Sequence, residues 1–156
     1  MVIPDYAIKE TRHTGIVDDD IINQIVLSNL TRVMSEDLQI ITEPVTFNNG
    51  LEIVQYPELK SLDLIFMDIN MPILNGIEAT IKIRNILKDD CPKIVCYSTM
   101  DKDYLKSKFN IEESLFDEYL PKPTTDMTVL EKILCRAFKI EESRVMPTRF
   151  HQTKSL

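Results

Sequence analysis

The chain of 156 residues lacks long apolar runs and has few cysteines. No segment approaches the roughly 20 apolar residues of a membrane span, and Pro4 and Asp5 interrupt the apolar residues near the start, so we expect neither export nor membrane anchoring. The three cysteines are an odd number without CxxC or CxxH spacing, and Cys96 and Cys135 lie in apolar stretches. Free thiols in a reduced, cytoplasmic compartment are the simplest interpretation.

Acidic residues also outnumber basic ones, at 25 to 18. The formal net charge is -7 and the isoelectric point is about 4.9, so nucleic acid and anionic membrane surfaces would be repelled, and we expect neither as a direct partner. Internal repeats and low-complexity tracts are absent from the sequence. With 44% hydrophobic and 28% charged residues, the chain has enough apolar side chains for one sizeable core and no room for a second.

Strand-like runs alternate with segments of helical periodicity, a pattern that predicts an α/β fold with a parallel sheet covered by helices on both faces. The predicted strands are 14–17, 40–47, 64–67, 94–97 and 119–120. Pro44 favours an edge position for the second strand, because proline cannot donate a ladder hydrogen bond. The run 64–67 is apolar on both alternations and should be central. These features suit a flavodoxin-like, doubly wound sheet of five strands in the order 2-1-3-4-5.

A helix is expected after each strand, and three of the five have apolar stripes at helical spacing: Ile22, Ile25, Val26, Leu30 and Val33 in the first, Ala79, Ile83, Ile86 and Leu87 in the third, and Met127, Leu130, Ile133, Leu134 and Ala137 in the fifth. The second helix should be short and span 51–55. The fourth should span 101–108 and is only weakly amphipathic. The segment 110–115 fits neither period. One of the residues 124–126 should cap the fifth helix.

Charged side chains end three of the predicted strands. Asp18 and Asp19 follow the first, Asp68 follows the third, and Lys122 follows the fifth. In the order 2-1-3-4-5 the topological switch lies between strands one and three, so the acids should meet in the crevice where such folds bind ligands. Three close carboxylates repel one another, and hard oxygen donors suit Mg²⁺ and phosphate oxygens. The hydroxyls of residues 98 and 99 would lie at the same rim.

Four short motifs occur in order along the chain. They are Ile16-Val17-Asp18-Asp19-Asp20, then Met67-Asp68-Ile69-Asn70-Met71-Pro72 with Gly76 four residues further on, Ser98 after the fourth strand, and Tyr119-Leu120-Pro121-Lys122-Pro123. Each motif alone is weak, but the ordered set resembles the receiver domain of two-component response regulators. The resemblance runs from about Arg12 to Phe138, and 67–84 is most similar to receivers of hybrid kinases and phosphorelays.

The resemblance implies a role for each matching residue. Asp68 would be the phosphoacceptor; Asp18, Asp19 and Asp68 would hold Mg²⁺ together with the backbone carbonyl of Asn70; Lys122, followed by a cis peptide at Pro123, would contact the phosphoryl group; Ser98 and Tyr119 would be the switch residues. Thr99 stands where the family usually has alanine, so the switch hydroxyl is either Ser98 or Thr99. Asp20 is expected to point into solvent or to cap the next helix.

The chain is therefore expected to comprise an N-terminal extension at 1–11, a receiver domain at 12–139 and a flexible C-terminal tail at 140–156. A histidine kinase or a histidine phosphotransfer protein would donate the phosphoryl group. We expect no output domain after Phe138, so the effect would come through binding a partner, passing the phosphate on, or acting on a part of a longer protein. A downstream protein would read the face made by the fourth helix, fifth strand and fifth helix. We expect no turnover of an external substrate.

Two alternatives remain open. A pseudo-receiver would have the fold and act as an interaction module without phosphorylation, although Asp18, Asp19, Asp68 and Lys122 all being present argues against it. A phosphatase of the haloacid-dehalogenase type would need a second acid two residues after its nucleophile, where this sequence has Asn70. Neither His13 nor His151 has the surroundings of a phosphorylated histidine, so this chain should receive phosphate rather than donate it.

Overall fold

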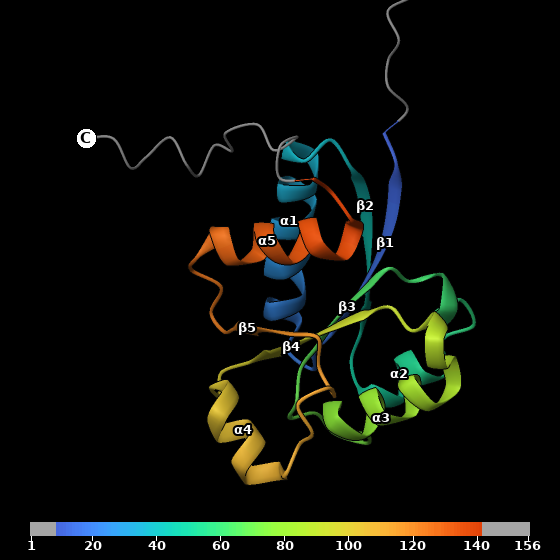
Figure 1. The fold of residues 1–156 in the computed structure, drawn as a ribbon, viewed down its shortest axis with the longest axis vertical. Helices are drawn as coiled ribbons and strands as arrows, with labels where there is room; N and C mark the ends of the chain where they lie inside the picture. The colour runs from blue at the N-terminus through green and yellow to red at the C-terminus, as the bar shows by residue number, and fades with distance from the viewer. Residues whose placement is uncertain (1–8, 142–156) are drawn as a thin grey trace, which may run out of the picture.

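The computed structural model describes residues 9–141, in which strands and helices alternate as the sequence predicts (Figure 1). The elements are β1 Thr11–Val17, α1 Ile21–Asp37, β2 Ile41–Phe47, α2 Gly50–Val54, β3 Leu64–Met67, α3 Gly76–Leu87, β4 Lys93–Ser98, α4 Lys102–Phe109, β5 Glu118–Pro121 and α5 Met127–Phe138. Within 9–141, none of the helices combines the length and the apolar character that a bilayer crossing requires. The predicted tail lies, from residue 142 onward, outside the described residues.

All five strands are parallel and form one sheet in the order β2-β1-β3-β4-β5, which confirms the predicted fold class and the edge position of the strand that contains Pro44. The first strand begins three residues earlier than predicted. Thr11 and Arg12 pair with Ile41 and Thr42 of β2, so β1 extends along the edge strand beyond its pairing with β3. The polar residues in this stretch concealed the extension from the sequence pattern.

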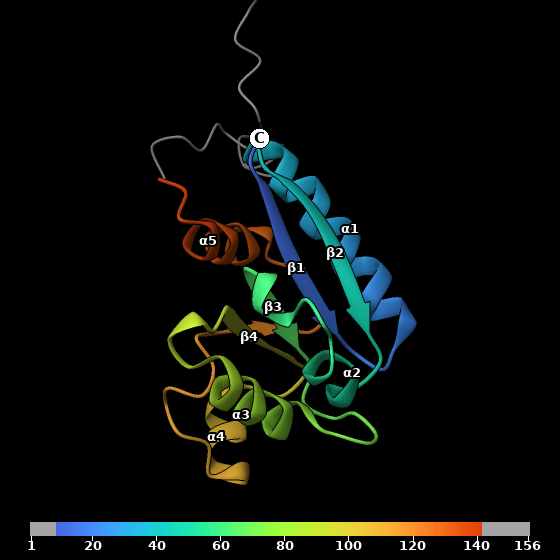
Figure 2. The ribbon, with the colours of Figure 1, turned by 90° about the vertical axis from the view of Figure 1, so that its right-hand side faces the viewer.

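The helices form two layers, with α1 and α5 on one face of the sheet and α2, α3 and α4 on the other (Figures 1 and 2). Alternate residues of β3 supply both cores, because successive side chains of a strand point to opposite faces. Leu64 and Phe66 join the cluster under α1 and α5, while Ile65 and Met67 join the cluster under the other three helices. All four residues of β3 are buried, as its continuous apolar run predicts.

The prediction for the first helix is wrong in its orientation. Ile22, Ile25 and Val26 of the expected core stripe are 61%, 51% and 45% exposed. The buried residues of α1 are instead Gln24, Leu27, Ser28, Thr31, Met34 and Ser35. Both sets repeat at helical spacing, so periodicity alone does not decide which one faces the sheet. Small polar side chains allow α1 to lie close to the sheet, and the large apolar residues of its first turns remain in solvent.

The other helices follow the predictions more closely. In α5, Leu130, Ile133 and Leu134 are buried, and Asp126 caps the helix by accepting a hydrogen bond from the Thr128 amide. In α4 only Leu105 is buried, in agreement with its weak amphipathicity. Ile86 in the last turn of α3 is 58% exposed, so its assignment to the buried stripe is wrong.

The segment 110–115, which is ambiguous in sequence, lies in an irregular loop at 110–117 that is anchored to α3. The guanidinium of Arg84 donates a hydrogen bond of 2.7 Å to the Leu115 carbonyl and forms an ion pair of 3.1 Å with Asp117. The same Asp117 carboxylate accepts a hydrogen bond from the backbone amide of Ile94 at the start of β4. The loop is thereby fixed at the end of the sheet opposite to the predicted crevice.

Candidate functional site

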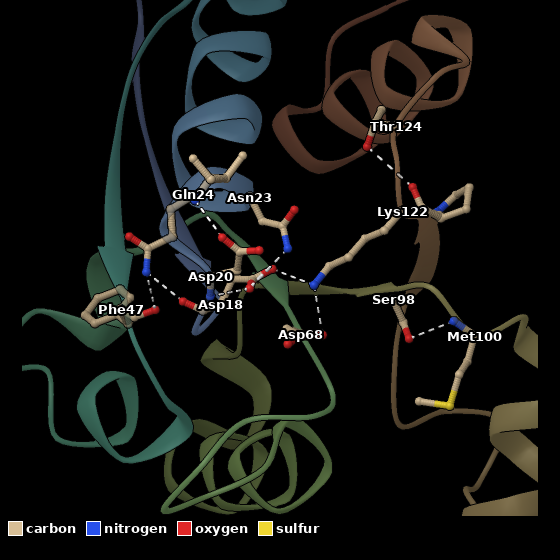
Figure 3. A network of polar contacts seen from close by, with 12 residues as sticks. Asp18, Asp20, Asn23, Gln24, Phe47, Asp68, Ser98, Met100, Lys122 and Thr124 are labelled. Atoms are coloured by element: carbon tan, nitrogen blue, oxygen red, sulfur yellow. Dashed lines mark hydrogen bonds and ion pairs between the residues drawn. The ribbon is translucent and has the colours of Figure 1, made fainter.

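The acidic residues occupy the carboxyl ends of β1 and β3. The Asp18 amide donates to the Phe47 carbonyl of β2 and the Asp68 amide donates to the Val17 carbonyl of β1, at 3.0 and 2.9 Å. Each strand therefore continues its ladder by one residue, which fixes the backbone of both aspartates relative to the sheet. Figure 3 shows both side chains entering the crevice between α1 and the loop after β5.

Three carboxylates come together in this crevice. Oxygen atoms of Asp18, Asp19 and Asp68 all lie within 4.8 Å of one another. Asp18 is 1% exposed and Asp68 8% exposed, whereas Asp19 is exposed, so the cluster is open to solvent on the Asp19 side. Asn70 lies two residues beyond Asp68 with an exposed side chain.

Lys122 reaches across the sheet to the acids. Its Nζ lies 2.5 Å from Asp18 Oδ2 and 3.0 Å from Asp68 Oδ1, and its side chain is 9% exposed (Figure 3). Its backbone amide donates to the Ser98 carbonyl at 2.9 Å, which continues the pairing of β5 with β4. The Lys122-Pro123 peptide bond is cis, as the resemblance implied. Residues from β1, β3 and β5 thus form one compact ionic site.

The charges in the site perturb one another. Burial raises the pKa of Asp68, the Lys122 ammonium opposes this shift, the Asp18 charge adds to it, and the net pKa of Asp68 is above its ordinary value. Burial alone would lower the pKa of Lys122, but its hydrogen bonds and ion pairs with Asp18 and Asp68 outweigh burial and raise it. The site therefore holds more negative charge than Lys122 alone neutralises.

The donor atoms fit a small divalent cation. Two oxygens on opposite sides of an octahedral Mg²⁺ lie about 4.2 Å apart, since each Mg–O bond is about 2.1 Å, and the spread of the three carboxylates is close to this value. All donors are hard oxygens, and the exposed side of the cluster leaves room for water and phosphate ligands. We conclude that Asp18, Asp19 and Asp68 form a candidate magnesium site.

Asp18 is held in position by the turn that follows β1. Its Oδ1 accepts hydrogen bonds from the Asp20 amide at 2.9 Å and from the Asn23 side chain at 3.4 Å. Asp20 caps α1 by accepting from the Ile22 amide at 2.8 Å, which is one of the two predicted roles for this residue. Consequently Asp20, although adjacent to the acidic pair, does not belong to the cluster.

Gln24 is a site residue that the sequence analysis missed. Its buried amide donates to the Asp18 carbonyl at 2.6 Å, to the Phe47 carbonyl at 3.3 Å and to Asn48 Oδ1 at 3.0 Å (Figure 3). It therefore joins the turns after β1 and β2. The sequence feature that could have revealed Gln24 is its position one helical turn before Ser28, on the face of α1 opposite to the apolar stripe predicted for the core.

The two candidate switch hydroxyls, of Ser98 and Thr99, lie in clearly different positions. Ser98 is buried at the rim of the site and its Oγ accepts a hydrogen bond from the Met100 amide at 3.1 Å, whereas Thr99 is exposed. Tyr119 lies beside a cavity that Ser98 also lines. Its phenol oxygen is buried without a hydrogen-bond partner in residues 9–141, and its ring contacts Phe116 edge to face at a centroid distance of 5.9 Å.

The raised pKa of Asp68 gives the metal-free protein a characteristic pH dependence. A folded-state pKa above the ordinary value of 3.8 means that the folded state binds the proton more tightly than the unfolded state. The stability linked to Asp68 is then fully present below pH 3.8 and is lost as the pH rises through the folded-state pKa.

We accordingly expect Asp68→Asn to be more stable than the parent near neutral pH in the presence of a chelator, and to lack this part of the pH dependence. Thermal melts between pH 3 and 8 would measure both effects. If the substitution lowers the melting temperature at pH 7 without metal, the carboxylate is stabilised rather than strained by its surroundings.

Comparison with known proteins identifies the family of the chain. Residues 15–134 match the response regulator receiver domain. The chain is 30% identical over 132 residues, 85% of its length, to the CAI-1 autoinducer sensor kinase/phosphatase CqsS of Vibrio cholerae, and it spans only 18% of that protein.

Solved receiver domains have the same fold. The receiver domain of the Pseudomonas aeruginosa sensor histidine kinase PA1611, with a magnesium ion in its active-site cleft, has a TM-score of 0.64 and 24% identity, over 83% of this chain and 98% of that one. The Saccharomyces cerevisiae Ssk1 receiver, solved with the histidine phosphotransfer protein Ypd1, has a TM-score of 0.60 and 27% identity, over 82% of this chain and 89% of that one. The chain therefore belongs to the response regulator receiver domain family, the signalling domains of two-component and phosphorelay systems.

Proposed function

We propose that this chain receives a phosphoryl group from a phosphohistidine onto Asp68. The observation that carries the proposal is the position of the Asp68 carboxylate, at the end of the central strand, 3.0 Å from the Lys122 ammonium and within the acidic cluster. The two charged groups are preorganised at the carboxyl ends of β3 and β5, which lie on either side of β4. Positioning and electrostatics supply most of the catalysis in phosphoryl transfer.

The proposed reaction uses Asp68 as nucleophile. A carboxylate oxygen of Asp68 forms a bond to phosphorus as the bond from phosphorus to the histidine nitrogen breaks, and the imidazole leaves with the electron pair and takes up a proton. The Lys122 ammonium lies where it can neutralise a phosphoryl oxygen. Mg²⁺, held by Asp18, Asp19 and Asp68 with the carbonyl of Asn70, would supply charge neutralisation at the phosphoryl oxygens. The product is an aspartyl phosphate, with no external substrate turned over.

Intact mass spectrometry tests the assignment of the acceptor. The parent, incubated with acetyl phosphate and Mg²⁺, should gain the mass of one phosphoryl group, and Asp68→Asn should gain none. The matched control is Asp20→Asn, because Asp20 adjoins the acidic pair but caps α1, and asparagine is an equally good cap. Labelling of Asp68→Asn to the level of the parent would refute the assignment. A parent that remains unlabelled would favour the pseudo-receiver.

The donor is proposed to be a histidine phosphotransfer protein. An exposed apolar surface lies beside the site on the first turns of α1 and consists of Ile21, Ile22, Ile25 and Val26. It begins one residue after Asp20, so a protein that delivers a phosphohistidine to Asp68 must come close to it. Contiguous exposed apolar side chains next to a polar site are typical of protein interfaces. The Ssk1 receiver, which resembles this chain, was solved with such a phosphotransfer protein.

Charge substitution on this surface separates donor docking from chemistry. We expect Ile22→Glu with Ile25→Glu to slow transfer from a phosphorylated phosphotransfer protein at least about tenfold, since two interface anchors of about 1–2 kcal/mol each are lost. Labelling by acetyl phosphate should be unchanged. Ile86→Glu on α3 is the matched control, with 58% exposure on the opposite layer. Equal transfer rates for the parent and the double variant would exclude α1 as the docking surface.

The output is proposed to leave through α4, β5 and α5. Ser98 and Tyr119 line one cavity of about 210 Å³ between the site and α4. The phenol oxygen of Tyr119 has no hydrogen-bond partner within residues 9–141, which leaves its ring free of hydrogen-bond constraint there. A phosphoryl group that attracts the Ser98 hydroxyl would move the loop after β4 and allow Tyr119 to turn. Because Leu105 is the sole fully buried residue of α4, this helix can shift at low cost, and a downstream partner would read the change.

A further inference from the structure

Tyr97 is a fully buried aromatic residue in contact with the reactive lysine. It lies on β4 with 2% of its surface exposed, in the core cluster under α1 and α5. The Lys122 Nζ lies over its ring, 4.7 Å from the centroid. The contact follows from the sheet: Tyr97 pairs with Leu120, and the chain then leaves β5 so that the Lys122 side chain passes over the ring toward Asp18.

The Tyr97 ring can limit the conformational freedom of the Lys122 side chain. A lysine side chain is flexible, and it tends to extend its ammonium into water. The carboxylates of Asp18 and Asp68 attract the ammonium from one side but do not restrict the four carbons that carry it. An aromatic ring is rigid, and its negative face attracts a cation within about 6 Å of the centroid. The ring therefore restricts Lys122 through a contact that the acids do not supply.

We propose that Tyr97 is a positioning residue for Lys122, whose ring holds the ammonium between Asp18 and Asp68 before the phosphoryl group arrives. Within residues 9–141, no hydrogen bond links Tyr97 to the acidic cluster, and its contact with the site is the one with Lys122. Its effect passes through Lys122 alone, by reducing the reorganisation that phosphoryl transfer requires. The kinetic consequence of this role rests on the proposed function, whereas the contact between ring and lysine is a property of the unphosphorylated protein.

Two substitutions of Tyr97 distinguish the effect of its ring from the effects of its hydroxyl and of apolar packing. Tyr97→Phe retains the ring, and Tyr97→Leu removes it. We expect Tyr97→Leu to be labelled by acetyl phosphate about tenfold more slowly than the parent and to bind beryllofluoride about tenfold more weakly, as befits the loss of one desolvated cation–π contact. Its Mg²⁺ affinity should stay within about twofold of the parent, because the three carboxylates are unaltered. Tyr97→Phe should restore the parent values.

The control for general core damage is Phe138→Leu, which removes a buried ring from the same cluster at the far end of α5. It should lower stability and leave the labelling rate of the folded protein unchanged. The role of the ring is overturned if Tyr97→Leu is labelled as fast as the parent, or if Tyr97→Phe is as slow as Tyr97→Leu.

An independent measurement needs neither phosphate nor metal. In the NMR spectrum of the metal-free parent, the ε-methylene protons of Lys122 should be shifted upfield of those of the exposed Lys60 by the ring current of Tyr97. The shift should persist in Tyr97→Phe and disappear in Tyr97→Leu. If the parent shows no such shift, Lys122 does not rest on the ring and the proposal is wrong, even if Tyr97→Leu fails to fold. Failure of the labelling reaction in the parent would leave this shift intact and would count against the proposed function instead.

Discussion

Lys122→Met is expected to lower the free energy of unfolding of the metal-free protein by about 3–5 kcal/mol at neutral pH. Lys122 makes the ion pairs with both buried acids, at 2.5 Å to Asp18 and 3.0 Å to Asp68. Methionine has a similar length and no charge, so the substitution retains most of the packing and removes the positive charge that compensates the two carboxylates. The cost is the burial of carboxylates without a counter-charge.

Three comparisons make this expectation specific. Lys60→Met, at an exposed lysine, should change stability by no more than about 0.5 kcal/mol. Asp68→Asn added to Lys122→Met should recover part of the loss, because it removes one of the uncompensated charges. Mg²⁺ should stabilise Lys122→Met more than it stabilises the parent. Chemical denaturation in chelator and in Mg²⁺ would measure all three, and a Lys122→Met protein as stable as the parent without metal would show that the ion pairs contribute nothing net.

Gly76→Ala is expected to destabilise the protein by at least about 3 kcal/mol. A Cβ atom at Gly76 would lie 1.8 Å from the carbonyl oxygen of Asp68 and 2.8 Å from its carbonyl carbon. Both are backbone atoms at the end of the central strand, so no side-chain rotation relieves the overlap. The Gly76 amide also donates to the Ile69 carbonyl at 2.9 Å, and a displacement of α3 would break this bond.

The effect should also reach the active site, because the obstructed carbonyl belongs to the proposed acceptor. We expect slower labelling of Gly76→Ala in the fraction that folds. Gly15→Ala is the matched control: the nearest atoms to its Cβ would all be side-chain atoms, of Leu62 at 3.2 Å, Ile53 at 3.4 Å and Phe47 at 3.5 Å. Its stability should stay within about 1 kcal/mol of the parent, since those side chains can yield and alanine costs less backbone entropy. Similar losses for the two glycines would contradict the steric explanation.

The sequence predicted the features that depend on local chemistry and on strand order. Pro44 identified the edge strand, the apolar run ending at Met67 identified the centre, and those two positions brought Asp18 and Asp68 together. Lys122 was expected at the same crevice from its position after the fifth predicted strand, and the resemblance added its role beside the phosphoryl group. Such residues carry their own signal, because a charge after a buried strand is unusual in itself.

The features that escaped prediction depend on tertiary neighbours. The predicted orientation of α1 was wrong because two stripes of the same period compete, and the stripe that faces the sheet combines Leu27 and Met34 with polar residues. Gln24 and Tyr97 are ordinary residues in their local sequence, and their roles appear only when the turn after β2 and the lysine after β5 lie beside them. The steric requirement at Gly76 likewise arises from an approach between two backbone segments.

The ion pair between Asp18 and Lys122 spans 104 positions of the sequence, which has a consequence for the order of folding. The chain through Asp68 contains all three acids, and the lysine that compensates them is made only 54 residues later, so a growing chain carries repelling charges at the future site. Contacts of such long sequence separation form late, because the entropy cost of closing the long loop arises before the contact can contribute stability. Completion of β5 is thus the step that relieves the repulsion. We expect the proposed acceptor site to arise cooperatively with the last strand, so that fragments ending before it would lack a formed site.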